Sequence, residues 1–109
     1  MDLDERQTRA IAAQAAAARA YARLLKLAEE RDSGQIPHVA RFLASTWNGQ
    51  AYPFDLFGLR TVDIAISDDM LLCLDALRWA KADLYKLGPD GDERIRAVIE
   101  AWGIAEEQS

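Results

Sequence analysis

Apolar residues recur at intervals of three and four along most of this chain, which is the spacing of one face of an α-helix. Neither glycine nor proline occurs between Leu3 and Arg31, and residues 10–18 are almost all alanine, the strongest helix former. One long helix is therefore predicted over residues 2–31. Ile11, Gln14, Ala18, Tyr21, Leu25 and Ala28 fall on one narrow stripe of this helix, which should pack either against the chain's own core or against another copy.

A helix of that length measures about 43 Å at ~1.5 Å per residue, which exceeds the width of a compact domain of this size. Part of it should therefore project from the rest of the chain or pack against a partner. Small side chains allow two helix backbones to approach closely, so the alanines favour a second copy of the chain. We expect a homodimer formed through this helix.

A second helix should begin near residue 36, with Pro37 in its first turn, and end at Trp47. Asn48-Gly49 is expected to supply a left-handed stop. The inward residues of this helix should be Val39, Phe42 and Leu43.

Asp55 can cap a turn that carries Leu56 and Leu59. The branched residues at 61–66 would also suit a strand, but the helical spacing of apolar residues continues beyond them. A long central helix is therefore predicted, ending near Leu87.

Polar and acidic residues also mark two helix starts. Ser67 is an alternative N-cap of the central helix, and it would place the two aspartates that follow it in the first turn, where negative charge is favourable. Asp90 and Glu93 have the spacing of a capping box at the start of a last helix, which Gly103 would close.

These segments predict an all-α fold, a small helical domain of four to five helices with a long N-terminal alanine-rich helix. We expect a single domain over residues 1–109, composed of the helix at 2–31 and a helical core at 36–104, because a chain of 109 residues can bury one core and not two.

The net charge of −5 is unevenly distributed. Residues 67–109 hold five Lys or Arg and ten Asp or Glu and carry −5, whereas residues 1–31 hold six and five and carry +1. Proteins that bind nucleic acid normally present a basic patch, so direct nucleic-acid binding is disfavoured. The weaker alternative is DNA binding by a basic face of the first helix, formed by Arg6, Arg9, Arg19, Arg23 and Lys26.

The chain contains no apolar stretch near the roughly 20 residues that a membrane-spanning helix needs. Its acidic start differs from a secretory signal, which opens with basic residues. The single cysteine, Cys73, lies among leucines, which favours a buried and unreactive thiol. We therefore expect a cytoplasmic protein without a membrane segment.

The chain resembles an uncharacterised family of small proteobacterial proteins, often carried on integrative conjugative elements and plasmids, in three segments: Val39-Ala-Arg-Phe-Leu43, Trp47-Asn48, and Phe54-Asp-Leu followed by Val62-Asp-Ile-Ala-Ile-Ser-Asp-Asp-Met70. The resemblance covers residues 38–104 and leaves the N-terminal helix outside. It implies a mobile-element context and no catalytic residues, because the family has no established activity.

Four acids, Asp55, Asp63, Asp68 and Asp69, are candidates for a metal or acid–base site, since paired carboxylates bind hard cations. The last three do not share a helix face, so caps and solvated surface are the better interpretation. His38 is the only histidine, and the sequence has no nucleophile motif or phosphate-binding loop. We expect no enzyme activity, catalytic residue, metal or cofactor.

The candidate partner surface combines the first helix with exposed aromatic residues. Trp79 lies beside Arg78 and Lys81, and Trp and Arg are enriched at the centres of interfaces. The predicted partner-binding residues are Ile11, Ala15, Ala18, Tyr21, Ala22, Leu25, Tyr52, Phe57 and Trp79.

The favoured function is that of a non-enzymatic accessory protein, encoded on a mobile element, that acts by protein–protein contact. The alternative is an acidic inhibitor or nucleic-acid mimic directed at a host defence or nucleic-acid-binding complex, because an acidic surface competes for a basic groove.

Overall fold

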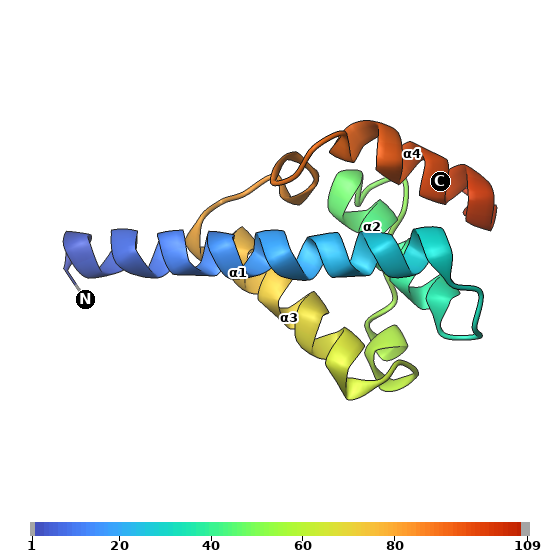
Figure 1. Cartoon of the computed structure of the whole chain (residues 1–109), viewed down its shortest axis with the longest axis horizontal. Helices are drawn as coiled ribbons and strands as arrows, with labels where there is room; N and C mark the ends of the chain where they lie inside the picture. The colour runs from blue at the N-terminus through green and yellow to red at the C-terminus, as the bar shows by residue number, and fades with distance from the viewer. Residues whose placement is uncertain (1, 108–109) are drawn as a thin grey trace.

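The computed structural model describes residues 2–107, and within this range it holds helices and no strand. The four α-helices are α1 (Leu3–Glu30), α2 (Ile36–Trp47), α3 (Ile64–Trp79) and α4 (Gly91–Trp102). The connections contain two short 3₁₀ turns, η1 (Leu56–Arg60) and η2 (Leu84–Lys86). Figure 1 shows α1 running the length of the molecule, with α3 diverging from it on one side and α4 lying on the other. The predicted all-α fold with a long N-terminal helix is confirmed.

Helix α1 begins at a well-formed cap, since the Asp2 carboxylate accepts a hydrogen bond of 2.8 Å from the Glu5 main-chain N–H. The face that α1 buries departs from the predicted stripe in the N-terminal half, where Ile11 is 70% exposed and Gln14 is also exposed. The alanine block makes every face equally apolar, so the local pattern carries no directional signal there. The residues that α1 buries are Ala13, Ala17, Ala20, Tyr21, Leu24, Leu25 and Ala28.

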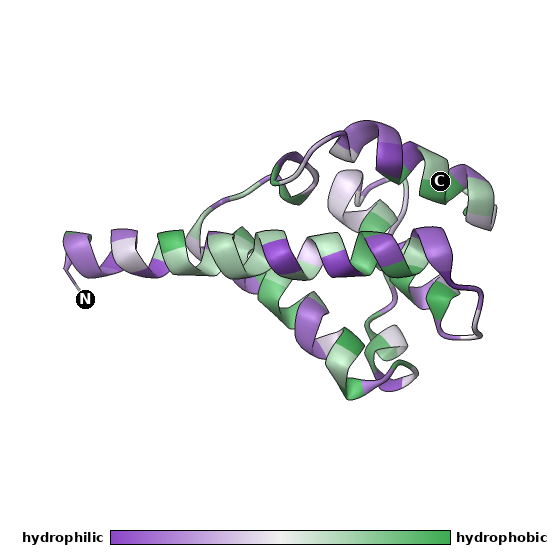
Figure 2. Cartoon of the chain, viewed as in Figure 1, coloured by the Kyte–Doolittle hydropathy of each residue, from purple (hydrophilic) through white to green (hydrophobic). Residues whose placement is uncertain are grey.

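Helix α2 packs against α1 and α4 and buries Val39, Phe42 and Leu43 as predicted. Pro37 occupies the first turn, also as predicted. The left-handed stop is wrong, because Asn48 ends the helix with a φ of −151° and a main-chain N–H bonded to the Ala44 carbonyl. The hydrophobic colours in Figure 2 gather where α1, α2 and α3 converge, whereas the first turns of α1 are mainly hydrophilic.

The predicted central helix is shorter than expected at both ends. The turn capped by Asp55 forms as η1, but α3 begins only at Ile64, so the chain is not helical throughout from residue 56. Asp63 is the N-cap, which corrects Ser67 and places Asp68 and Asp69 beyond the first turn.

The start of α3 is set from a distance. The Asp63 main-chain N–H donates to Gln35 Oε1 at 2.8 Å, and Gln35 Nε2 donates to Asp63 Oδ2 at 3.0 Å. At the other end, α3 stops at Trp79, and Lys81 adopts a φ of 54°. The predicted extension to Leu87 is therefore wrong.

Helix α4 begins at Gly91, close to the predicted start, but the expected capping box is absent. Asp90 has a φ of 57°, and its side chain makes no capping hydrogen bond. Gly103 closes the helix in the left-handed conformation, as predicted, and the Ile104 N–H donates to the Ile99 carbonyl at 3.0 Å. No helix within residues 2–107 is both long enough and apolar enough to cross a membrane.

Candidate interaction surfaces

The N-terminal third of α1 extends beyond the rest of the fold. No residue from 3 to 12 is buried, and the first buried position is Ala13. The molecule accordingly measures 44 × 28 × 27 Å, and its long axis follows α1 (Figure 1). Arg9 links this end to α3, because its guanidinium pairs with Asp75 at 2.6 Å and lies 5.0 Å from the centre of the Trp79 ring.

The predicted partner-binding residues of α1 divide into two groups. Ile11, Ala15 and Ala22 are exposed, and Ala18 is half-buried. Tyr21 and Leu25 are only 3% and 4% exposed and belong to the chain's own core, so their assignment to a partner surface is wrong. Both side chains are large and apolar, and α1 turns them towards the core that it shares with α2 and α3.

The predicted aromatic residues lie on separate parts of the molecule. Trp79 is half-buried beneath Arg9, and its indole Nε1 is buried without a hydrogen-bond partner within residues 2–107. Tyr52 is half-buried and its ring centre lies 6.2 Å from that of Trp47, whereas Phe57 is 66% exposed.

Arg41 joins the two hollows that these aromatic residues line. Tyr52 and Arg41 line one of about 380 Å³, and Phe57, His38 and Arg41 line another of about 390 Å³. Arg41 could not be predicted as a member of either hollow, because an exposed arginine on a helix carries no distinctive sequence pattern.

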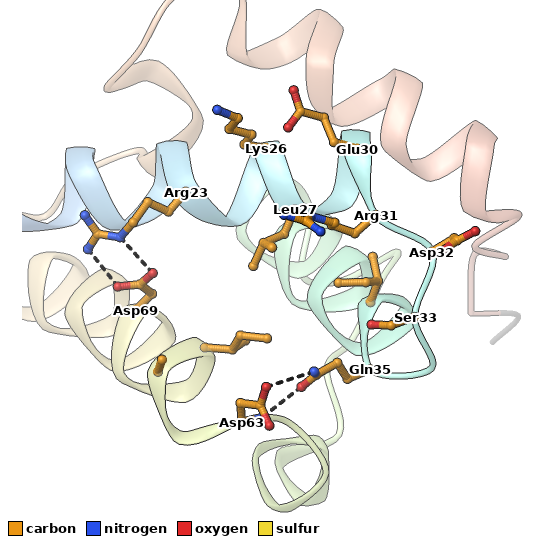
Figure 3. Close-up of a pocket in the computed structure, with 13 residues that line it drawn as sticks. Arg23, Lys26, Leu27, Glu30, Arg31, Asp32, Ser33, Gln35, Asp63 and Asp69 are labelled. Carbon is orange, nitrogen blue, oxygen red and sulfur yellow. Dashed lines mark hydrogen bonds and ion pairs between the residues drawn. The ribbon is translucent and has the colours of Figure 1, made fainter.

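A groove of about 610 Å³ lies between the C-terminal half of α1, the loop after it and the start of α3 (Figure 3). We call it the α1–α3 groove. Leu27, Ile36 and Ile66 supply its apolar lining. The charged and polar residues around it include Lys26, Glu30, Arg31, Asp32 and Ser33.

Two side-chain pairs bridge the walls of the α1–α3 groove. Arg23 donates to both oxygens of Asp69, at 3.0 Å from Nε and 2.7 Å from a terminal nitrogen, and this contact raises the pKa of Arg23. The Gln35–Asp63 pair forms the second bridge, as Figure 3 shows. Sequence reasoning missed Gln35, because its partner is 28 positions away and no local pattern marks it.

Three of the four candidate acids are engaged in structural contacts. Asp55 accepts a hydrogen bond from the Phe57 N–H at 2.9 Å, while Asp63 and Asp69 form the two bridges of the groove. Within the described part of the chain, no group of three or more His, Cys, Asp and Glu side chains could hold a metal ion. Cys73 is buried as predicted, and desolvation raises its pKa to about 12, so the thiol stays protonated at neutral pH.

The chain belongs to a family of unknown function (DUF7673), which matches residues 18–103. The match begins inside α1, so the C-terminal half of this helix belongs to the family region. The expectation that the whole N-terminal helix lies outside the family is therefore wrong. No curated protein and no solved structure matches the chain.

Proposed function

We propose that the protein is a non-enzymatic accessory protein of the cytoplasm that acts by protein–protein contact, as a homodimer formed through the exposed face of α1. One observation carries this proposal: no residue from 3 to 12 reaches the buried core, and the outward positions of α1 are exposed as far as Lys26. Isolated helices of about this length are marginal in water, so an additional partner would stabilise the projecting end.

The chemistry of the exposed face supports contact with another helix. Ala15 and Ala22 would let a second backbone approach closely, and Ile11, which is 70% exposed, offers apolar area to bury. The corrected dimer surface therefore keeps Ile11, Ala15, Ala18 and Ala22 and excludes the two core residues.

Light scattering coupled to size-exclusion chromatography tests the dimer. The wild-type chain should elute at twice its mass of 12.1 kDa, and Ala15→Glu should convert it to the monomer by placing a carboxylate in the contact. Ala101→Glu is the matched control, because Ala101 is also an exposed helical alanine. Removing residues 1–31 would not be informative, since α1 supplies much of the core. A monomeric wild type over the micromolar range would contradict the homodimer.

The acidic-mimic function remains the second candidate, supported by charge. Asp68, Glu93 and Glu100 are exposed and form no ion pair within residues 2–107. The proposal expects a basic nucleic-acid-binding protein of the host to be retained at low salt and lost at high salt. Retention that is insensitive to salt would count against it.

The structure also bears on DNA binding by the basic face of α1. Arg9 and Arg23, two members of that face, pair with acids of α3. Absence of a gel shift at low salt would remove this possibility. The proposed mobile-element origin is tested by the neighbouring genes, which should include conjugation or integration functions.

A further inference from the structure

The exposed face of α1 carries one continuous row of residues at alternating spacings of three and four. We call it the outer row, and each of its residues is exposed. Its members are Glu5, Thr8, Ala12, Ala15, Arg19, Ala22 and Lys26. Its small residues are Thr8, Ala12, Ala15 and Ala22, and its charged residues are Glu5 at the N-terminal end and Arg19 and Lys26 in the C-terminal half.

The charges of the outer row are segregated along the helix. Its N-terminal end carries Glu5, next to the acids Asp2 and Asp4, whereas its C-terminal half carries Arg19 and Lys26. None of these side chains forms an ion pair within residues 2–107. They are therefore available to a partner with the opposite order of charge.

We propose that two copies of the chain pack antiparallel along their outer rows, so that Glu5 of each chain lies beside Lys26 of the other. This inference rests on the proposed homodimer and specifies its geometry. Reversal of the row about Ala15 places Ala15 opposite itself, Thr8 opposite Ala22, and Glu5 opposite Lys26. It also places Arg19 opposite the small side chain of Ala12, which leaves room for the longer one. A two-fold axis requires such self-complementarity.

Charge and shape both disfavour the parallel alternative. A parallel pair would place Glu5 against Glu5 and Lys26 against Lys26, and it would repeat this repulsion at both ends. It would also pack the two projecting ends only against each other, away from the core of either chain. In the antiparallel pair, residues 3–12 of one chain lie along residues 19–28 of the other, the part of α1 that its own core supports.

Charge reversal tests the register. Glu5→Lys and Lys26→Glu should each weaken the dimer by about tenfold, because the symmetry converts two attractive pairs into two repulsive ones, and the double variant should return to within about twofold of wild type. Sedimentation equilibrium gives the dissociation constants. Glu100→Lys, which reverses an exposed and unpaired charge on α4, is the control and should leave the constant unchanged. Single reversals without effect, or a double variant that is not restored, overturn the antiparallel register.

Cross-linking gives an independent test on intact dimers. An equimolar mixture of Glu5→Cys and Lys26→Cys chains should form an intermolecular disulfide with oxidised glutathione, whereas neither variant alone should do so. A disulfide within one chain is impossible, because 21 residues of helix separate the two sites by about 31 Å. A disulfide formed by Glu5→Cys alone overturns the register but leaves the homodimer intact. A wild type that sediments as a monomer overturns both.

Discussion

A chain of hydrogen bonds joins α1 to α2, and it predicts that substitutions of its two side chains differ in their cost to stability. The Tyr21 hydroxyl lies 2.8 Å from Thr46 Oγ1, and Thr46 Oγ1 donates to the Leu43 carbonyl at 2.6 Å. Thr46 has one hydroxyl proton and uses it on that carbonyl, so Tyr21 must be the donor in the first bond. Burial raises the pKa of the Tyr21 hydroxyl, which therefore keeps its proton at neutral pH.

The two single substitutions should differ in cost. Tyr21→Phe removes the donor and leaves Thr46 bonded to Leu43, so it should lower the free energy of unfolding by about 1 kcal/mol. Thr46→Val removes the acceptor and leaves the Tyr21 hydroxyl without a partner. Because the Tyr21 side chain is only 3% exposed, this should cost about 1–3 kcal/mol. The double variant removes both groups and should lose less than the sum of the singles, by about 1 kcal/mol.

Urea unfolding followed by circular dichroism, at one fixed protein concentration, measures all four proteins. The concentration must be constant because self-association would add to the apparent stability. The reasoning is refuted if Thr46→Val costs no more than Tyr21→Phe, or if the two losses are additive. Either result would mean that the Tyr21 hydroxyl does not depend on Thr46 in the folded state.

Three further predictions concern other contacts of the core. Gly91→Ala should destabilise the protein by about 3 kcal/mol, because the new Cβ would collide with the Tyr85 carbonyl oxygen. Gly88→Ala is the control, since a Cβ at residue 88 meets free space and should leave the thermal midpoint unchanged. Equal thermal midpoints of the two variants would contradict the predicted collision. With its pKa raised to about 12, Cys73 should resist a thiol reagent in the folded protein. As the pH rises, the thiol loses its proton in the unfolded chain before it does so in the folded one, so the free energy of unfolding should fall above about pH 8.5. The fall should be smaller in Cys73→Ala, and identical curves of unfolding free energy against pH for the two proteins would refute this. Trp102→Phe should cost about 1 kcal/mol by chemical denaturation, because Nε1 donates at 2.8 Å to the carbonyl of Ala28 in the last turn of α1; an unchanged midpoint would show that water replaces this bond.

Local sequence was sufficient wherever one residue type has one strong conformational preference. Three such features were predicted correctly: Pro37 in the first turn of α2, Gly103 at the end of α4, and the run of strong helix formers in α1. Each acts on the backbone within a few residues of its own position. The inward residues of α2 were also predictable, because large apolar side chains alternate there with small and polar ones.

Tertiary contacts decided the features that the local pattern left undetermined. The start of α3 depends on Gln35, which lies 28 positions before its partner Asp63. The spacing of apolar residues along the sequence cannot predict a contact between side chains so far apart. Asp69 of α3 pairs with α1 in the same way, since its partner Arg23 is 46 positions away. Sequence reasoning treated these acids as caps or solvated surface.

The candidate interaction surface shows the same division. The sequence by itself determined that α1 is a long helix of small residues that exceeds the width of its domain. Only the tertiary structure decided which side of that helix is free, because alanine is equally compatible with core and surface. The large residues Tyr21, Leu24 and Leu25 set the rotation of α1 by entering the core, and they thereby turned the outer row towards solvent.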